Sequence, residues 1–228
     1  MTAERRQIPI GGGKTVSAVV LHPHAPAPGP LTAVVLAHGA GNDMNTPFLS
    51  AVHEGLAARG YVAVRFNFPY KERGGRAPDP PAVLQACYRH VIAAIRAEPE
   101  MPPQRIVIGG KSLGGRMASH VAAQGEDVAG LIFLGYPLHS ARKTDQLRVA
   151  HLDRIRVPML FFAGTRDSLC NLELLRQTLK RLPAATTLHV IEGGDHSFAV
   201  PKALRRDAAD VWAEIVAASA QWLQSLAP

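Results

Sequence analysis

One serine of the chain stands in a setting that could make it a nucleophile. Ser112 is the centre of GKSLG at 110–114, which has the form G-x-S-x-G. The motif falls between an expected strand, Arg105–Gly109, and an expected helix, Leu113–Gln124. In that context the serine projects from a tight turn, and amide groups at the helix start favour negative charge that develops there. We therefore interpret Ser112 as a nucleophile, with helix capping as its alternative role.

A serine hydroxyl is a weak nucleophile at neutral pH, so it needs a base, and the base needs an orienting acid. Asp167 follows the expected strand Pro158–Ala163, and His196 follows the expected strand Thr187–Ile191. Because the carboxyl ends of parallel strands meet at one edge of a sheet, these side chains should lie near Ser112. The chain order serine, acid, histidine is also the order that accompanies this motif. The sequence therefore predicts a Ser112, His196 and Asp167 triad.

Other acidic residues fit the acid position less well. Asp195 adjoins His196, but adjacency in the chain does not aim its carboxylate at the ring, and a turn-forming role suits it better. Asp153 lies outside any strand end, and Asp43 comes too early in the chain. The segment 136–138 after another expected strand offers no acid.

A developing oxyanion needs two backbone N–H donors. The expected donors are Leu113, which follows the nucleophile, and Ala40, in the HGAG segment at 38–41. The glycines of that segment let the backbone turn towards a substrate. The alternative is that they only form a turn.

Several cationic residues fall near the same predicted edge, and guanidinium groups bind carboxylates through paired hydrogen bonds. Arg65 is the first candidate for holding an anionic substrate group because it closes a strand, and surface charge or structural pairing is the alternative. The others are Lys71, Arg73, Arg76, Lys111, Arg116 and Arg166.

Apolar, β-branched runs alternate with helical patterns along the chain. The expected strands are Thr15–Leu21, Ala33–His38, Val62–Phe66, Arg105–Gly109, Gly130–Gly135, Pro158–Ala163 and Thr187–Ile191. The expected helices are Phe48–Arg59, Pro80–Ala97, Leu113–Gln124, Leu172–Arg181 and Pro201–Leu226. This alternation predicts an α/β fold whose mostly parallel sheet carries helices on both faces. No linker divides it, so one domain is expected over residues 1–228.

Composition excludes several classes of protein. The net charge is +7, but no Lys/Arg block exceeds two residues and aromatic residues make up only 6%, so no nucleic-acid partner is expected. A nucleic-acid binder would lose affinity steeply with salt. No apolar run approaches the ~20 residues that span a bilayer, and the first residues lack a signal-peptide stretch, so neither a membrane partner nor export is expected. The expected location is the cytoplasm, and the oligomeric state is open.

Cofactor and metal sites are also not expected. Cys87 and Cys170 are too few for a disulfide framework, and no Cys or His stands at zinc-ligand spacing from either. A phosphate loop needs a glycine five positions before its Gly-Lys pair, and the two GK pairs have Ile8 and Arg105 there. The predicted chemistry therefore rests on side chains and backbone amides alone.

Four segments, in this order, resemble the α/β-hydrolase superfamily: HGAG at 38–41, GKSLG at 110–114, GTRD at 164–167 and GGDHSF at 193–198. Together with RFNFPY at 65–70, the chain is similar to a compact, lidless group that includes dienelactone hydrolases and the testis-expressed and chromatin-complex-subunit hydrolase-like proteins. Dienelactone hydrolases use a cysteine nucleophile where this chain has Ser112, so their substrate is not carried over. Where many superfamily members insert a cap, only residues 136–157 are available, so the resemblance implies an open site without a cap domain.

The expected function is hydrolysis of a small ester or related acyl compound by a serine hydrolase, carboxylesterase-like, with an acyl-enzyme intermediate. A thioesterase or small peptidase is an alternative, because the triad does not choose the leaving group. A non-catalytic interaction module that keeps the hydrolase fold is the alternative from another class, since fold does not imply function.

Overall fold

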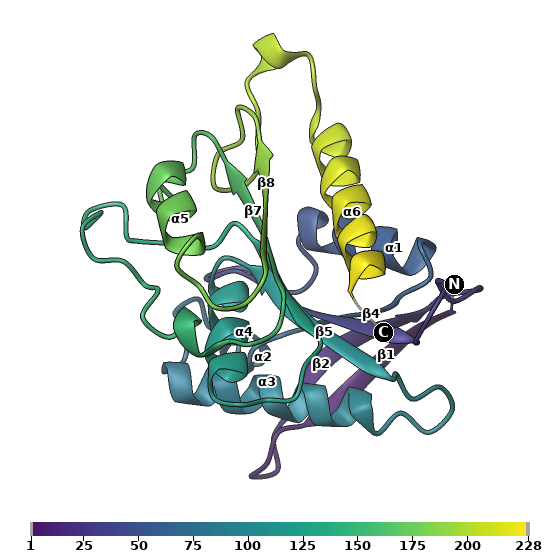
Figure 1. The fold of residues 1–228 in the computed structure, drawn as a ribbon. Coiled ribbons are helices and arrows are strands. Elements are labelled where there is room, and N and C mark those ends of the chain that lie inside the picture. Colours follow the sequence, from purple (N-terminus) through teal and green to yellow (C-terminus); the bar gives the residue numbers. More distant parts are fainter. Residues whose placement is uncertain (1, 227–228) are drawn as a thin grey trace.

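A sheet of eight strands forms the centre of the computed structural model, which describes residues 2–226 (Figure 1). The strand order is β1-β2-β4-β3-β5-β6-β7-β8. The strands β3 to β8 pair in parallel, whereas β1 and β2 are antiparallel additions at one edge. Their bounds are β1 Thr2–Pro9, β2 Thr15–His22, β3 Thr32–Ala37, β4 Val62–Phe66, β5 Arg105–Lys111, β6 Gly130–Leu134, β7 Met159–Gly164 and β8 Thr186–Ile191.

The central strands are apolar on both faces because helices cover both faces of the sheet. Every residue of β3, β4, β6 and β7 is buried. Such strands have continuous apolar runs instead of the polar alternation of a half-exposed sheet. Within β3, Ala33 and Val35 contribute to one apolar core, and Val34 and Leu36 to the other.

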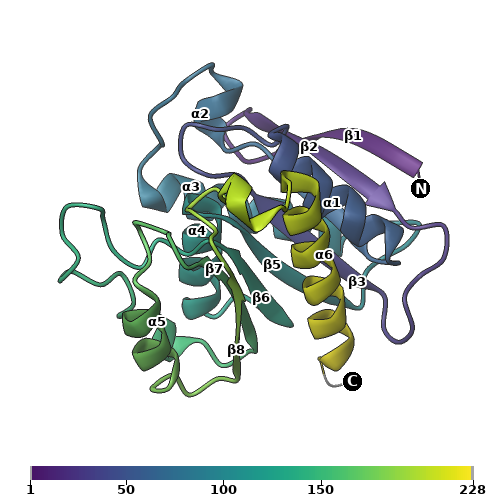
Figure 2. The ribbon, with the colours of Figure 1, turned by 90° about the horizontal axis from the view of Figure 1, so that it is seen from above.

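The helices divide into two layers, which the view from above separates (Figure 2). One core packs α3, α4 and α5 against the sheet, and the other packs α1 and α6. The predicted α/β fold with helices on both faces is therefore confirmed. The helices are α1 Pro47–Ala58, α2 Pro69–Glu72, α3 Pro81–Arg96, α4 Leu113–Ala123, α5 Leu172–Leu179 and α6 Ala208–Ser225.

The connection between β6 and β7 is short and forms no cap over the sheet. It contains loops and one short 3-10 turn, Leu152–Arg154. Across the described residues 2–226, no separate cap domain is present, as the short connection predicts.

The sequence interpretation missed β1 and the short helix α2, and it started the last helix too early. In β1 only Ile8 is buried among residues 3–9, so the strand lacks an apolar pattern. Pro201 instead precedes a 3-10 turn, and Arg205 then adopts the left-handed conformation with φ of 50°. Asp207 caps α6: its carboxylate accepts from the Asp210 amide, which is 2.9 Å away, and the Asp210 carboxylate accepts from the Asp207 amide. This reciprocal pair fixes the start of the helix.

Two further features bear on the composition arguments. Cys87 and Cys170 are free thiols and both are buried. Burial raises the pKa of each thiol to about 12. Among the helices between residues 2 and 226, none is long and apolar enough to cross a membrane.

Candidate active site

The three candidate residues follow the strands β5, β7 and β8 and lie at one edge of the sheet. Ser112 is the only residue between the end of β5 and the start of α4. Asp167 lies three positions after β7, and His196 lies five positions after β8. Because β5, β6, β7 and β8 are parallel neighbours in the sheet, their carboxyl ends meet along this edge.

The turn that carries Ser112 is strained and tightly packed. Ser112 has φ of 48° and ψ of −108°, a conformation that L residues other than glycine rarely adopt. A Cβ atom at Gly110 or Gly114 would lie 2.1 or 2.2 Å from the carbonyl oxygen of Ala37 in β3. The motif glycines therefore let this turn sit directly against β3, and strain of this kind is often found at functional sites.

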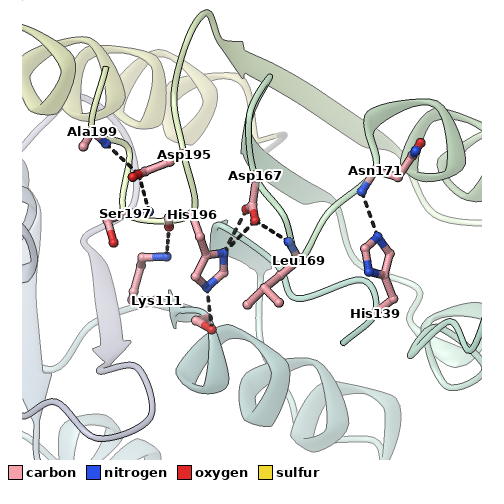
Figure 3. Close-up of polar contacts among 10 residues, drawn as sticks. Lys111, His139, Asp167, Leu169, Asn171, Asp195, His196, Ser197 and Ala199 are labelled. Carbon is pink, nitrogen blue, oxygen red and sulfur yellow. Dashed lines mark hydrogen bonds and ion pairs between the residues drawn. The ribbon is translucent and has the colours of Figure 1, made fainter. Parts of the chain in front are cut away.

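The side chains of Ser112, His196 and Asp167 form a continuous chain of contacts. Figure 3 labels His196 and Asp167. The Nε2 atom of His196 lies 2.9 Å from the Ser112 Oγ atom. The Nδ1 atom lies 2.8 and 3.0 Å from the two Asp167 carboxylate oxygens. With the ring proton on Nδ1, Asp167 accepts it, and Nε2 is free to accept the serine hydroxyl proton. This arrangement has the geometry for removing a proton from Ser112.

Asp167 is held where it can orient the imidazole. Its side chain has no exposed surface, and its Oδ1 atom accepts from the Leu169 amide, which is 2.8 Å away. A buried carboxylate without donors would be costly, so the amide and the imidazole N–H stabilise it in place.

The His196 loop is shaped by its neighbour Asp195, which has the turn-forming role expected of it. The Asp195 Oδ1 atom accepts from the amides of Ser197 and Ala199, at 2.7 and 2.9 Å (Figure 3). Phe198 in the same turn has φ of 62°. The carboxylate of Asp195 is thus committed to backbone donors and not to the imidazole.

Lys111 also contacts the His196 loop. Its ammonium donates a hydrogen bond to the backbone carbonyl of His196 (Figure 3). It also lies 5.2 Å from the centre of the Phe198 ring. Burial lowers the pKa of Lys111 to about 8, although the negative charges of Asp167 and Asp195 oppose that shift. The sequence interpretation had placed Lys111 among the edge cations, because the motif alone does not say where its variable side chain points.

The two expected oxyanion donors, Leu113 and Ala40, follow the strands β5 and β3. Leu113 is the first residue of α4, so its N–H has no acceptor within the helix. Ala40 is exposed in the turn after β3. Gly39, which precedes Ala40, lies against the turn that carries Ser112. A Cβ atom at Gly39 would be 3.7 Å from the Cβ atom of Ser112.

His38 orders this turn and does not belong to the triad. It is buried, its Nδ1 atom lies 2.8 Å from the Gly39 carbonyl oxygen, and its Nε2 atom accepts from the Phe68 amide at 3.1 Å. Burial lowers the pKa of His38 to about 4.

Arg65 lies among structural partners within the fold. Its side chain is buried, and its Nη1 atom donates to the Met44 carbonyl, at 2.8 Å, and to the Ser50 hydroxyl. A guanidinium that holds a substrate carboxylate needs its paired donors free. The structure therefore favours structural pairing for Arg65, the alternative that the sequence left open.

A cavity of about 390 Å³ is lined in part by residues next to the triad in the chain. Its wall includes Lys111 and Ser197, the chain neighbours of Ser112 and His196. Phe48 and Trp212 also line it, and the sequence analysis placed them only within the expected helices Phe48–Arg59 and Pro201–Leu226. Periodicity alone cannot distinguish a side chain that lines a cavity from one that fills a core. In the described part of the chain, no cluster of three or more His, Cys, Asp or Glu side chains could hold a metal ion.

Comparisons with known proteins agree with this architecture. A family model described as an alpha/beta hydrolase domain matches residues 30–224. The structure is similar to a dienelactone hydrolase from Anabaena variabilis (TM-score 0.76, 17% identity, 100% of both chains covered). It is also similar to a lidless α/β serine hydrolase from Xanthomonas campestris (0.75, 20% identity, 97% of this chain and 95% of that one) and to an esterase domain from Rhodothermus marinus (0.73, 17% identity, 98% of each). At these identities, the likeness shows the fold.

The close approach of Gly110 to the carbonyl oxygen of Ala37 leads to a stability prediction. Gly110→Ala should lower the free energy of unfolding by about 2–4 kcal/mol, because its Cβ atom would collide with the Ala37 carbonyl. Gly125→Ala is the matched control: Gly125 also has a positive φ, of 90°, but nothing lies within 4 Å of the added atom. Urea denaturation of both variants measures the difference. Equal losses of unfolding free energy in the two variants would show that the positive φ, and not the contact with β3, makes glycine necessary at position 110.

Proposed function

The chain belongs to the alpha/beta hydrolase family, and from this premise we propose that it is a serine hydrolase that cleaves small esters through an acyl-enzyme. The observation that carries the proposal is the chain of contacts from the buried Asp167 through His196 to the Ser112 hydroxyl. Two of the similar structures, an esterase domain and a serine hydrolase without a lid, support the same reaction class.

In the proposed acylation step, the Ser112 Oγ atom attacks the ester carbonyl carbon while His196 Nε2 takes the hydroxyl proton. Asp167 keeps the imidazole in the tautomer that can accept this proton and stabilises the imidazolium that forms. The carbonyl oxygen becomes an oxyanion, for which the amides of Leu113 and Ala40 are the proposed donors.

Collapse of the tetrahedral intermediate breaks the bond between the carbonyl carbon and the alkoxy oxygen. The imidazolium of His196 gives its proton to that leaving oxygen, so the alcohol departs neutral and Ser112 is acylated. Water then attacks the acyl-enzyme with His196 as the base again, which releases the acid and restores the serine hydroxyl.

The uncovered edge of the sheet supports small or protruding substrates. No cap domain encloses the site within residues 2–226, so a long lipid chain would find little apolar cover beyond the cavity. Compact esters require less enclosure, and the cavity volume of about 390 Å³ is near the lower end of the range of ligand sites.

Removal of the nucleophile tests the proposal directly. Ser112→Ala should lower kcat for a reactive ester by roughly 10⁴–10⁶-fold while the folded structure is retained. A fluorophosphonate probe should label the wild-type protein at Ser112, as shown by peptide mapping, and should not label the variant. Well-folded protein that is never labelled would remove the hydrolase proposal and favour the interaction-module alternative.

A pair of acid variants tests the role of Asp167. Asp167→Asn should lower kcat by about 10⁴-fold, because the amide favours the wrong imidazole tautomer. Asp195→Asn is the matched control, since its side-chain oxygen can still accept from the Ser197 and Ala199 amides. Steady-state kinetics with one ester compares the two. Similar activities in both variants would mean that Asp167 is not the orienting acid.

A further inference from the structure

The cavity beside the triad continues the proposed active site towards the helices α1 and α6. Asn42, in the turn after β3, and Ser197 and Ala199, of the His196 loop, are among its lining residues. Lys111, which precedes Ser112 in the chain, lines it as well.

Aromatic rings form the far wall of this cavity. The centres of the Phe48 and Phe198 rings are 5.4 Å apart, and those of Phe48 and Trp212 are 6.0 Å apart, in tilted and edge-on arrangements. Phe198 is fully buried, whereas Phe48 and Trp212 are only partly buried and leave part of their surface to the cavity. Aromatic rings at these distances and angles gain energy from a further ring that packs among them.

The charge of the wall restricts the ligand further. Lys111 is the one charged residue among those found to line the cavity in the described chain, and no carboxylate lines it. A cationic group would therefore meet a like charge and no counter-ion. A neutral ring meets the apolar wall without such a penalty.

We propose that this cavity is the specificity site of the enzyme and binds a compact, uncharged aromatic group of the ester substrate. The inference rests on the proposed hydrolase function and names its substrate class. The aromatic group can belong to the acyl part or to the alcohol part of the ester, and the test below separates these two sources.

Two pairs of esters, matched in size, test this inference. Methyl phenylacetate and methyl cyclohexylacetate differ in the acyl part, and benzyl acetate and cyclohexylmethyl acetate differ in the alcohol part. In the pair whose variable group enters the cavity, kcat/KM for the aromatic member should be roughly 3- to 10-fold higher. Trp212→Leu should abolish that preference, so that both members of the pair are cleaved with similar kcat/KM.

Trp222→Leu is the control for loss of a tryptophan from α6, because Trp222 packs near Gly130, away from the cavity. Thermal melting identifies any variant that does not fold, and Phe48→Leu then replaces Trp212→Leu. Fluorophosphonate labelling of each preparation separates the two hypotheses. Protein that is labelled at Ser112 but shows no aromatic preference, or cleaves none of the four esters, overturns the specificity site alone. Protein that is not labelled overturns the hydrolase function, and the specificity site with it.

A different observation concerns the ammonium group of Lys111, which donates a hydrogen bond to the backbone carbonyl of His196. We infer that Lys111 is a positioning residue. Its hydrogen bond to the His196 carbonyl holds the His196 imidazole within hydrogen-bonding distance of the Ser112 hydroxyl. Gly135 makes room for Lys111: a Cβ atom there would lie 2.9 Å from the ammonium nitrogen. The ring of Phe198 covers it from the loop side.

The protonated form of Lys111 makes the stronger, charge-assisted bond. Charged groups near it are Asp167 after β7 and Asp195 in the loop, with the imidazole of His196 beside them. Since burial lowers the pKa of Lys111 to about 8, the ammonium is present below that pH and is lost as the pH rises through it. The hydrogen bond from Lys111 to the His196 carbonyl should weaken over the same pH range.

The pH profile of kcat tests this inference. Wild-type kcat should fall as the pH rises through about 8. Lys111→Met should have a kcat about 10- to 100-fold lower at pH 7, with KM little changed, and no alkaline fall. Lys111→Gln keeps an uncharged donor, so it should recover part of the rate without the alkaline fall.

The rate of fluorophosphonate labelling should follow the same pH dependence and needs no substrate. A wild-type profile that is flat above pH 8, or a Lys111→Met variant with normal kcat, overturns the positioning role. Either result is compatible with labelling at Ser112, so it leaves the hydrolase function in place.

Discussion

A carboxyl group without solvent contact imposes the main constraint on this molecule. Asp167 has no exposed side-chain surface, so the energy of its charged form depends on the Leu169 amide and the imidazole of His196. Those two donors come from different loops. The turn built by Asp195 and the pairing of β7 with β8 hold these loops, and the hydrogen bond from Lys111 is proposed to do the same. The hydroxyl of Ser112 then meets an imidazole whose orientation is already fixed.

Much of this organisation could be predicted because it depends on short-range signals in the chain. Continuous apolar runs identified the buried parallel strands, and parallel strands bring the residues that follow them to one edge. The prediction of an α/β fold without a cap is confirmed on these grounds. Residue type, chain order and strand ends suffice to nominate Ser112, Asp167 and His196, whose side chains the structure places within hydrogen-bonding distance.

The remaining features depend on contacts between distant segments. The strand β1 is held by pairing with β2 and has almost no apolar face of its own, so no pattern marks it. From the sequence, Arg65 resembles a cation at the edge of the sheet. In the structure it donates a hydrogen bond to the carbonyl of Met44. Phe48 and Trp212 follow helical periodicity just as core residues do, and only the packing of α1 against α6 shows that they border a cavity. The sheet edge therefore holds the proposed chemistry, while the proposed selectivity belongs to two helices on one face.

The position of Trp212 has a spectroscopic consequence. The chain contains only two tryptophans, both on α6. Trp222 is packed into the apolar core, whereas Trp212 is partly exposed at the cavity beside Phe48. Indole emission shifts with the polarity of its surroundings, so water leaving the cavity changes one fluorophore and leaves the other as an internal reference. The fold thus carries its own optical reporter of occupancy.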